Sequence, residues 1–275
     1  MNMTHMLRGL VRKSARETWP GLVGFGAGLF AIVFLLRSVL PRIQEIVGQA
    51  AAQLPIARTM LGVLLGTDLG DEITARVLHS IIWVHPVVLA TVWGFEIWLC
   101  TRVPAGEIDR GTIDVLLGLP VSRSGLYIAE TVVWLVGGAC LMLVAWSAFL
   151  LAERVAGGHS VERARIGLVL LNFYALYIAV GAIALCASAR ANRRGRAIGA
   201  VLALVLGSML LNFLAAFWPA AERLSVLGVL RYYRPENILR TGIAPTGNIA
   251  VLLAVGSACW LLGLTIWTRR DVRTL

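Results

Sequence analysis

The chain has 275 residues, of which 58% are hydrophobic and 15% are charged, and its mean hydropathy is +0.79. A soluble domain holds about 45–50% apolar and about 25% charged residues, and a single core of this size could not bury the excess. The composition excludes a disordered chain, a disulfide-linked secreted domain and an ordinary soluble enzyme. It predicts an all-α polytopic membrane protein. The formal net charge of +10 fits basic loops beside a bilayer and does not indicate a nucleic-acid partner.

Residues 1–19 are basic and amphipathic. Leu7, Leu10 and Val11 have the i, i+3, i+4 spacing of one helical face, and the intervening arginines lie opposite. This pattern predicts an interfacial helix that lies on the membrane before the chain turns in at Pro20. No cleavage site follows, so we expect this segment to stay attached.

Six apolar stretches follow, and each has the length of about 20 residues that a bilayer crossing needs. Hydrocarbon offers the backbone no hydrogen-bond partner, so each stretch must be a helix. They are residues 20–40, 78–101, 124–152, 166–189, 197–219 and 247–268. We therefore predict a six-helix transmembrane domain over residues 20–275.

The connectors between these stretches differ in charge. Lys and Arg are denser in the set that includes both chain ends than in the opposite set, so both termini are predicted to be cytoplasmic. Arginine is strongly preferred over lysine, which favours a bacterial source and a multi-pass protein of the plasma (inner) membrane. The longest connector is the outer loop 41–77, whose short apolar stretch 60–65 is expected to lie at the interface.

Few ionisable residues lie within the spans, and those few are candidates for a function. Glu96 and Glu130 lie near the inner ends of their spans, where each can reach the interface or a loop arginine. His85 precedes Pro86, which predicts a kink in the second span. Arg37 lies near the outer end of the first span and is expected to extend toward the headgroups.

Several catalytic patterns are missing from the sequence. It has no GxxxxGK[ST] phosphate loop, no HExxH and no GxSxG, and its four cysteines lie singly in apolar stretches. We expect a non-catalytic chain without a metal or cofactor of its own. An intramembrane enzyme that uses Glu96 or His85 is the alternative.

The loop between the second and third spans is the most informative segment. It predicts a short helix over about residues 110–119, with Thr112 as its cap and Pro120 as its end. The helix has an apolar stripe that faces the membrane surface or a groove on another protein, formed by Ile113, Leu116 and Leu117. On physical grounds alone a simple interfacial turn is an equal alternative.

This loop resembles the corresponding segment of ABC-2 type transporter permeases. The matching residues are Gly106-Glu107, Arg110-Gly111-Thr112, Leu116-Leu117 and Pro120-Val121-Ser122-Arg123. In that family the segment is the coupling helix that docks into a separate ATPase subunit. The chain departs from the family at Glu130, where a lysine is common.

The resemblance implies the membrane-spanning subunit of an ATP-driven exporter. Two permeases, identical or related, would join two ABC ATP-binding subunits in the lipid bilayer, and ATP and magnesium would bind to those partners. The coupling residues that it implies are Glu107, Arg110, Gly111, Thr112, Ile113, Leu116, Leu117, Pro120 and Arg123. The apolar spans favour an apolar or amphipathic substrate. An ABC-linked membrane anchor or force-transmitting module that moves no solute is the alternative.

Two structural roles are also expected within this scheme. Glu107 should fix the coupling helix, with Arg110 or Arg123 as its ion-pair donor, and Gly111 should allow a close backbone approach. Three glycines on one face of the first span would allow close helix packing, and ordinary tolerance of glycine in membrane spans is the alternative; they are Gly21, Gly24 and Gly28.

Overall fold

The structure is a computed structural model that describes residues 3–53, 73–118, 121–157, 162–215 and 217–271. These residues are almost entirely helical and contain no strand. Six stretches among them are long and apolar enough to cross a membrane: His5–Arg42, His79–Cys100, Arg123–Ala156, Arg163–Arg190, Arg194–Leu214 and Thr246–Arg269. The predicted all-α fold with six membrane-crossing helices is confirmed.

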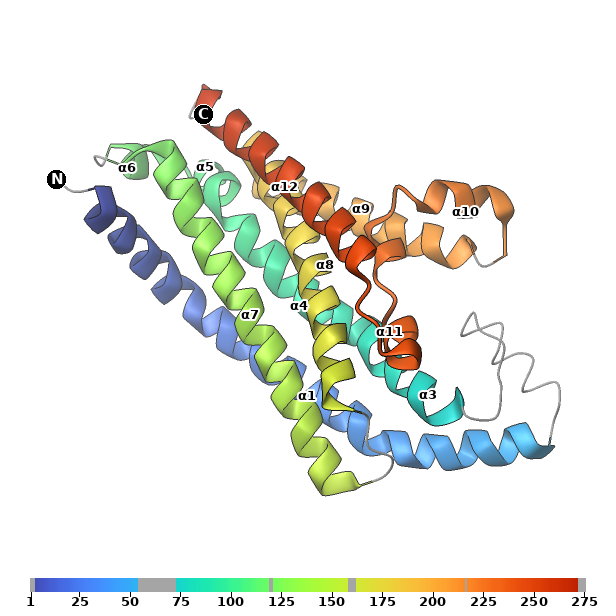
Figure 1. Ribbon diagram of the computed structural model, residues 1–275. Helices are drawn as coiled ribbons and strands as arrows, with labels where there is room; N and C mark the ends of the chain where they lie inside the picture. The colour runs from blue at the N-terminus through green and yellow to red at the C-terminus, as the bar shows by residue number, and fades with distance from the viewer. Residues whose placement is uncertain (1–2, 54–72, 119–120, 158–161, 216, 272–275) are drawn as a thin grey trace.

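The helices form an elongated bundle in which both chain ends lie at one end, beside α5 and α6 (Figure 1). We call this the terminal end. The helices in chain order are α1 (Met3–Gln53), α3 (Ile73–Val84), α4 (Pro86–Cys100), the π-helix η1 (Arg102–Gly106), α5 (Glu107–Asp109), α6 (Ile113–Leu117), α7 (Arg123–Ala156), α8 (Arg163–Arg190), α9 (Arg194–Leu214), α10 (Pro219–Ser225), the 3₁₀ helix η2 (Val229–Tyr232), α11 (Pro235–Thr241) and α12 (Thr246–Arg269).

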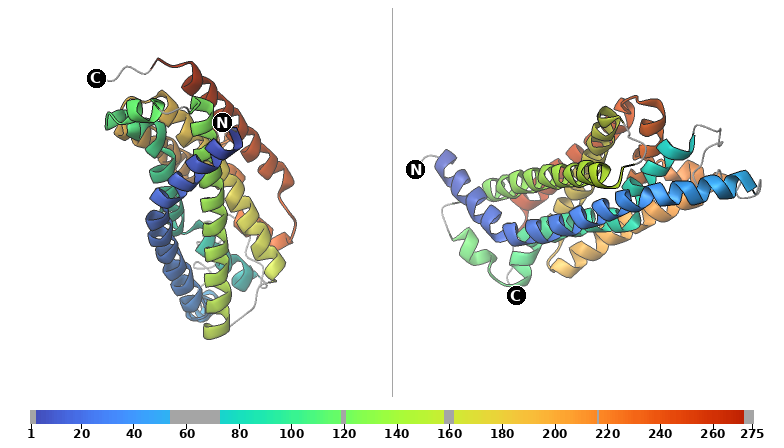
Figure 2. Two further views of the ribbon diagram at one scale, coloured as in Figure 1. Left: turned by 90° about the vertical axis from the view of Figure 1, so that its left-hand side faces the viewer. Right: turned by 90° about the horizontal axis from the view of Figure 1, so that it is seen from below.

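The first helix is longer than the sequence pattern suggests. α1 runs for 51 residues through Pro20 and Pro41, so no helix boundary separates the predicted interfacial helix 1–19 from the first span. Its N-terminal turns run at an angle to the rest of the helix (Figure 2), as is usual for helices that contain proline. The predicted loop 41–77 is helical as far as Gln53, and its apolar stretch 60–65 lies outside the described residues.

The predicted kink in the second span is confirmed. α3 ends at Val84 and α4 begins at Pro86, with His85 between them. The His85 Nδ1 atom accepts a hydrogen bond from the backbone N–H of Val87 at 3.3 Å, so this side chain caps α4. His85 is 11 positions before Glu96, about 16 Å along a helix, and the two side chains do not form a common site.

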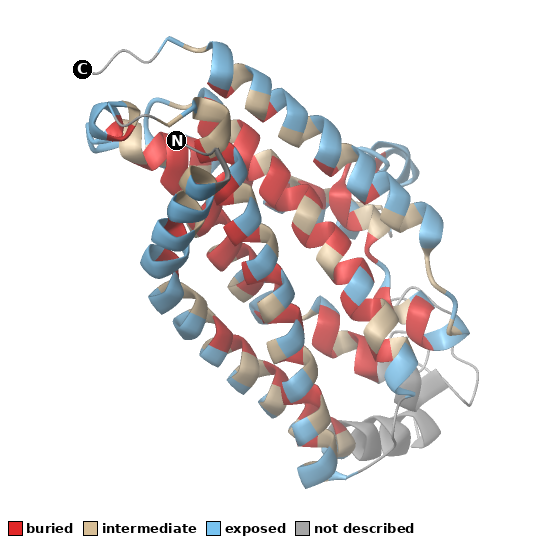
Figure 3. Cartoon of the chain, turned by 60° about the vertical axis from the view of Figure 1, so that its left-hand side comes forward, coloured by how far each residue is buried: buried red, intermediate tan, exposed pale blue. Residues whose placement is uncertain are grey.

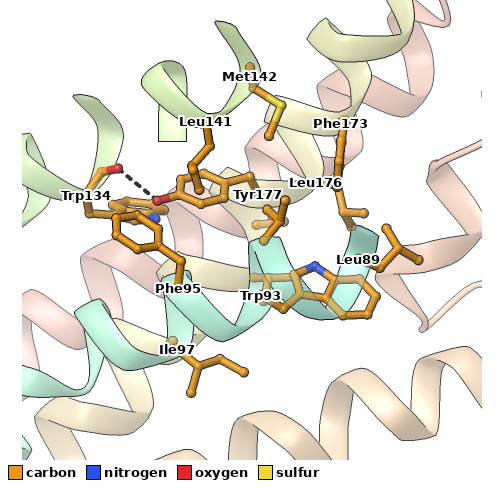
Figure 4. Close-up of a cluster of buried hydrophobic side chains, with 14 of the residues drawn as sticks. Leu89, Trp93, Phe95, Ile97, Trp134, Leu141, Met142, Phe173, Leu176 and Tyr177 are labelled. Atoms are coloured by element: carbon orange, nitrogen blue, oxygen red, sulfur yellow. Dashed lines mark hydrogen bonds between the residues drawn. The ribbon is translucent and has the colours of Figure 1, made fainter. Parts of the chain in front are cut away.

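The core of the bundle is built around α8, which is the most buried of the six spans. It packs against α12, α4, α9 and α7, while α1 packs mainly along α7. Buried residues line the inner faces of these helices and exposed residues line the outer faces (Figure 3). Large rings fill the interior (Figure 4), among them Trp93, Phe95, Trp134 and Tyr177. The apolar side chains on the outer faces face the lipid in a membrane protein.

Close helix packing occurs at one of the three predicted glycines. A Cβ at Gly21 would lie 2.6 Å from the Trp98 ring, whereas a Cβ at Gly24 or Gly28 would have no atom within 4 Å. Close packing is therefore present at Gly21, whereas Gly24 and Gly28 fit the alternative of ordinary glycine tolerance in a membrane span.

Isolated polar side chains in the spans bond between elements. The hydroxyl of Tyr177 donates to the carbonyl of Trp134 at 2.9 Å, and Asn172 donates to the carbonyl of Tyr232 at 3.2 Å. Arg37 is also buried, and its Nη2 atom donates to the Gly157 carbonyl at 3.3 Å. The expectation that Arg37 extends to the headgroups is wrong, because the end of α7 lies within its reach.

Candidate functional site at the terminal end of the bundle

The predicted coupling helix is a two-part corner. η1 leads from α4 into α5, a turn follows at Arg110 and Gly111, and α6 covers only Ile113–Leu117. The single helix expected over 110–119 is therefore wrong, because Gly111 has a φ of +69° and interrupts it. No atom would lie within 4 Å of a Cβ at Gly111, so this residue supplies a left-handed conformation and not a close approach. Pro120 lies outside the described residues.

Glu107 holds this corner together. Its carboxylate accepts hydrogen bonds from the Arg110 guanidinium and the Thr112 hydroxyl. The expected Glu107–Arg110 ion pair is present. The expectation that the Thr112 side chain caps α6 is wrong, because its hydroxyl is bonded to Glu107. Burial favours a higher pKa for Glu107, but the bonds from Thr112 and Arg110 outweigh it and lower the pKa below its ordinary value.

Arg123 does not contact Glu107. Its guanidinium donates to the backbone carbonyl of Arg270 and lies 5.6 Å from the centre of the Trp267 ring. The Trp267 Nε1–H in turn donates to the Arg123 carbonyl at 2.9 Å. The predicted Arg123–Glu107 pairing is wrong, because the first turn of α7 lies against the end of α12.

The apolar stripe of α6 faces this chain. Ile113 is fully buried and Leu116 is 8% exposed, both within the hydrophobic core, and Leu117 is half-buried. The expectation that the stripe faces the membrane or another protein is wrong for Ile113 and Leu116. The outer face of the corner carries Val115, which is 73% exposed, together with Gly111 and the exposed polar residues Asp109, Arg110, Thr112 and Asp114.

An ionic cluster lies directly beneath the corner, and its members Arg102, Glu130 and Ser14 are buried while Lys13 and Glu17 are exposed. The Arg102 Nη2 atom lies 2.8 and 3.0 Å from the Glu130 carboxylate oxygens and 2.6 Å from Ser14 Oγ, while Nη1 pairs with Glu17. Lys13 lies 3.5 Å from Glu17. We call these five residues the Arg102 cluster. They join α1, η1 and α7, and two positive charges balance two negative ones.

The Arg102 cluster tests the prediction made for Glu130. Glu130 is 4% exposed, and the expectation that it reaches a loop arginine is confirmed. Arg102 itself is not among the predicted site residues. Glu130 could have pointed to Arg102 from the sequence, because a carboxylate within a span requires a cation within reach. Burial favours a lower pKa for Arg102, but Glu130 and Glu17 outweigh it and raise the pKa, so the guanidinium stays charged.

Arg194, the first residue of α9, fixes the corner from the other side. The Arg194 guanidinium donates to the Trp98 carbonyl at 2.7 Å and to Thr101 Oγ1 at 3.3 Å, and so caps the end of α4. The backbone N–H of Arg194 donates to the Asp109 carboxylate at 3.3 Å. Asp109 on α5 therefore caps the start of α9.

Two further arginines complete a set of caps. The Arg270 Nη1 atom donates to the Ala189 and Ala191 carbonyls at 2.8 and 3.0 Å, at the end of α8. Arg123 bonds to the carbonyl after the end of α12. The carboxyl ends of α4, α8 and α12 thus each receive an arginine side chain, which satisfies carbonyls that a helix leaves unpaired. We call Arg194, Arg270 and Arg123 the three arginine caps.

Glu96 lies apart from these groups, and the expectation that it reaches the interface or a loop arginine is wrong, because it is enclosed in the core beside Trp134. It is fully buried, and its Oε1 atom accepts a hydrogen bond from Trp134 Nε1 at 3.1 Å. It packs against Gly181, where a Cβ would overlap the Trp134 ring and the carboxylate. No described residues gather three metal-ligating side chains. The hydrogen bonds that Glu96 and His85 accept come from the Trp134 indole and the Val87 backbone N–H.

Six membrane-crossing helices and an ordered corner at one end define a polytopic membrane subunit. Residues 52–214 match the family described as "ABC-2 family transporter protein". The match covers more than half of the chain, which therefore belongs to this family and is a membrane transporter subunit. The family assignment that the loop sequence suggested is confirmed. A comparison with curated proteins finds no match.

Proposed function

We propose that this chain is the permease subunit of an ATP-driven exporter. It pairs with a second permease, identical or related, and takes its energy from separate ABC ATP-binding subunits that hold ATP and magnesium. The observation that carries the proposal is the α5–α6 corner, with an exposed outer face and a firmly bonded inner face.

A docking element that transmits force must not unfold under load. Helices as short as α5 and α6 are unstable in isolation. Here Glu107 bonds to Arg110 and Thr112, Asp109 bonds to the start of α9, and Ile113 and Leu116 are buried. A push on the outer face therefore passes to α9 and, through η1 and Arg102, to α1 and α7.

The proposal also orients the chain. ABC ATP-binding subunits are cytoplasmic, so the terminal end with α5 and α6 faces the cytoplasm. The higher density of Lys and Arg in the connectors at this end supports the same orientation. In a bacterium the chain would lie in the plasma (inner) membrane with both termini inside.

The cargo is proposed to be apolar or amphipathic. A cavity of about 560 Å³ lies between α4 and α9, and most of its wall is apolar, including Ile97, Trp98, Ile198 and Leu202. Asp109 and Arg194 lie at its terminal end. An amphipathic molecule has the apolar body and polar group that such a lining fits.

Gentle purification followed by mass spectrometry tests the assembly. We expect a stoichiometric partner that carries a GxxxxGK[ST] phosphate loop. Val115→Asp should weaken its association roughly tenfold, because a charge replaces an exposed apolar contact. Leu116 is less suited to this test because it is buried in the chain's own core.

Leu227→Asp is the matched control, since Leu227 is 82% exposed and lies far along the chain from the corner. Association that is equally normal in both variants would contradict the docking role of α6. A complex that hydrolyses ATP but moves no amphipathic probe in vesicles would favour the anchor or force-transmitting module. A pure chain with activity but no partner would favour an intramembrane enzyme.

A further inference from the structure

A groove runs between α9 and α12 near the terminal end. Both helices pack against α8, but α9 and α12 hardly contact each other, and the cavity between them is floored by residues of α8. The cavity measures about 360 Å³, within the usual range for small-ligand sites. Its depth is lined by small and apolar residues, among them Ile183, Cys186, Ala187 and Ala200, with Cys259 on α12.

Two arginines lie at the mouth of this groove. Arg190 is the last residue of α8, and Arg196 is in the first turn of α9. Both are exposed and line the cavity. In the described part of the chain neither guanidinium has a hydrogen bond or ion pair, in contrast to Arg194 and Arg270 close by. No acidic residue lines the groove.

The positions of these groups match the layers of a bilayer. Arg190 and Arg196 lie at the ends of spans, where the headgroup region begins. Ile183 lies seven residues before Arg190 and about 10 Å deeper along the helix. A ligand that fits has a phosphate at one end and a hydrocarbon chain at the other.

We infer that the groove binds an anionic phospholipid from the adjoining leaflet. The lipid phosphate lies between the Arg190 and Arg196 guanidinium groups, and an acyl chain follows the Ala- and Cys-lined wall. Basic pockets between spans bind anionic headgroups in this way. The lipid fills the space that α9 and α12 leave between them and is distinct from any cargo in the cavity between α4 and α9.

A second copy of this chain is the other possible occupant. A packed helix from that copy would need to place acidic groups against two arginines at the membrane boundary. The apolar faces of the spans supply no such charge, whereas an anionic headgroup supplies it at the correct depth. Charge complementarity therefore favours the lipid.

Lipid retention tests the inference directly. The full chain is reconstituted in nanodiscs of mixed phosphatidylglycerol and phosphatidylcholine, released into detergent, and examined by native mass spectrometry. We expect one phosphatidylglycerol to be retained per chain, with phosphatidylcholine lost. The Arg190→Gln/Arg196→Gln variant should bind phosphatidylglycerol roughly 30-fold more weakly, since each arginine contributes roughly a fivefold change in affinity.

Arg193→Gln is the matched control, because Arg193 is exposed on the same loop but does not line the groove. Ala200→Trp tests the apolar part with both arginines kept, and Leu206→Trp on the outer face of α9 is its control. We expect Ala200→Trp to lose the lipid and both controls to retain it.

Three results would overturn the inference. In the first, the double-glutamine variant retains phosphatidylglycerol as the unmodified chain does. In the second, inorganic phosphate alone displaces the retained lipid, which leaves an anion site without a role for the acyl chain. In the third, Ala200→Trp abolishes self-association and leaves lipid retention unchanged, which assigns the groove to a second copy.

Discussion

The surroundings of Glu130 and Glu96 differ although both residues are buried glutamates near the terminal ends of their spans. Glu130 on α7 pairs with Arg102 at 2.8 Å and through it with α1. Glu96 on α4 has a neutral donor, the Trp134 indole. The difference arises from reach, because Arg102 follows α4 directly and its side chain extends toward α7. The Arg102 cluster is therefore a charged joint between three segments, whereas Glu96 is a polar residue within the core.

The largest effect is expected from Arg102→Leu, which leaves the Glu130 carboxylate buried without its cation. Removing one partner of a buried ion pair costs about 3–5 kcal/mol. The free energy of unfolding in mixed micelles measures this loss. Arg110→Leu is the matched control, because Arg110 is exposed and its ion pair is worth about 1 kcal/mol or less. Equal losses in the two variants would contradict the assigned role of the cluster.

Glu130→Gln should have an intermediate effect of about 1–3 kcal/mol, because Arg102 keeps Glu17 and Ser14 as partners. In the Arg102→Leu background the same change should cost far less, since no guanidinium then lies beside residue 130. A double-mutant cycle of unfolding free energies measures the coupling. A coupling energy near zero would show that the two residues do not act as a pair.

Glu96→Gln should change the free energy of unfolding by about 1 kcal/mol or less. The amide oxygen can still accept the Trp134 hydrogen bond, and no cation is left unpaired. The free energy of unfolding in mixed micelles measures this change too. A loss as large as that of Arg102→Leu would show that Glu96 is ionised and paired, and it would remove the contrast with Glu130.

The smallest effect concerns pH at the α5–α6 corner. The pKa of Glu107 is lowered in the folded chain, so its stabilising contribution is present above the unfolded value of about 4.5 and is lost as pH falls through the folded value. Amide hydrogen exchange over residues 107–118, corrected for intrinsic rates, should rise below this pH. Glu107→Gln should remove the pH dependence while the rest of the bundle stays protected.

The sequence predicts the spans better than it predicts the corner. Twenty-residue apolar stretches leave the chain no alternative to helices in a membrane, and Pro86 fixes the break before α4. Pro20 does not mark a helix boundary, because a helix can continue past a proline when its neighbours and local adjustments satisfy the freed carbonyl. The stripe of Ile113 and Leu116 could not be assigned to one face, because a periodic pattern does not show what covers it.

The polar contacts of the corner were only partly predictable. The Glu107–Arg110 pair is local, and a spacing of three residues is enough to predict it. The Arg102–Glu17 and Asp109–Arg194 contacts each join residues 85 positions apart, and the Arg102–Glu130 pair joins residues 28 positions apart. Their signal is chemical rather than positional: a buried charge needs a partner, but the sequence does not say which one.

The three arginine caps have a consequence for how the protein responds to its membrane. Each cap joins the end of one helix to a neighbouring segment: Arg194 holds α4, Arg270 holds α8 and Arg123 holds α12. A single capped helix cannot slide along its axis without breaking these bonds. A thinner or thicker bilayer must therefore be accommodated by tilting the bundle as a unit or by deforming the lipid around it. Hydrophobic mismatch then acts on the orientation of the whole subunit and leaves the α5–α6 corner intact.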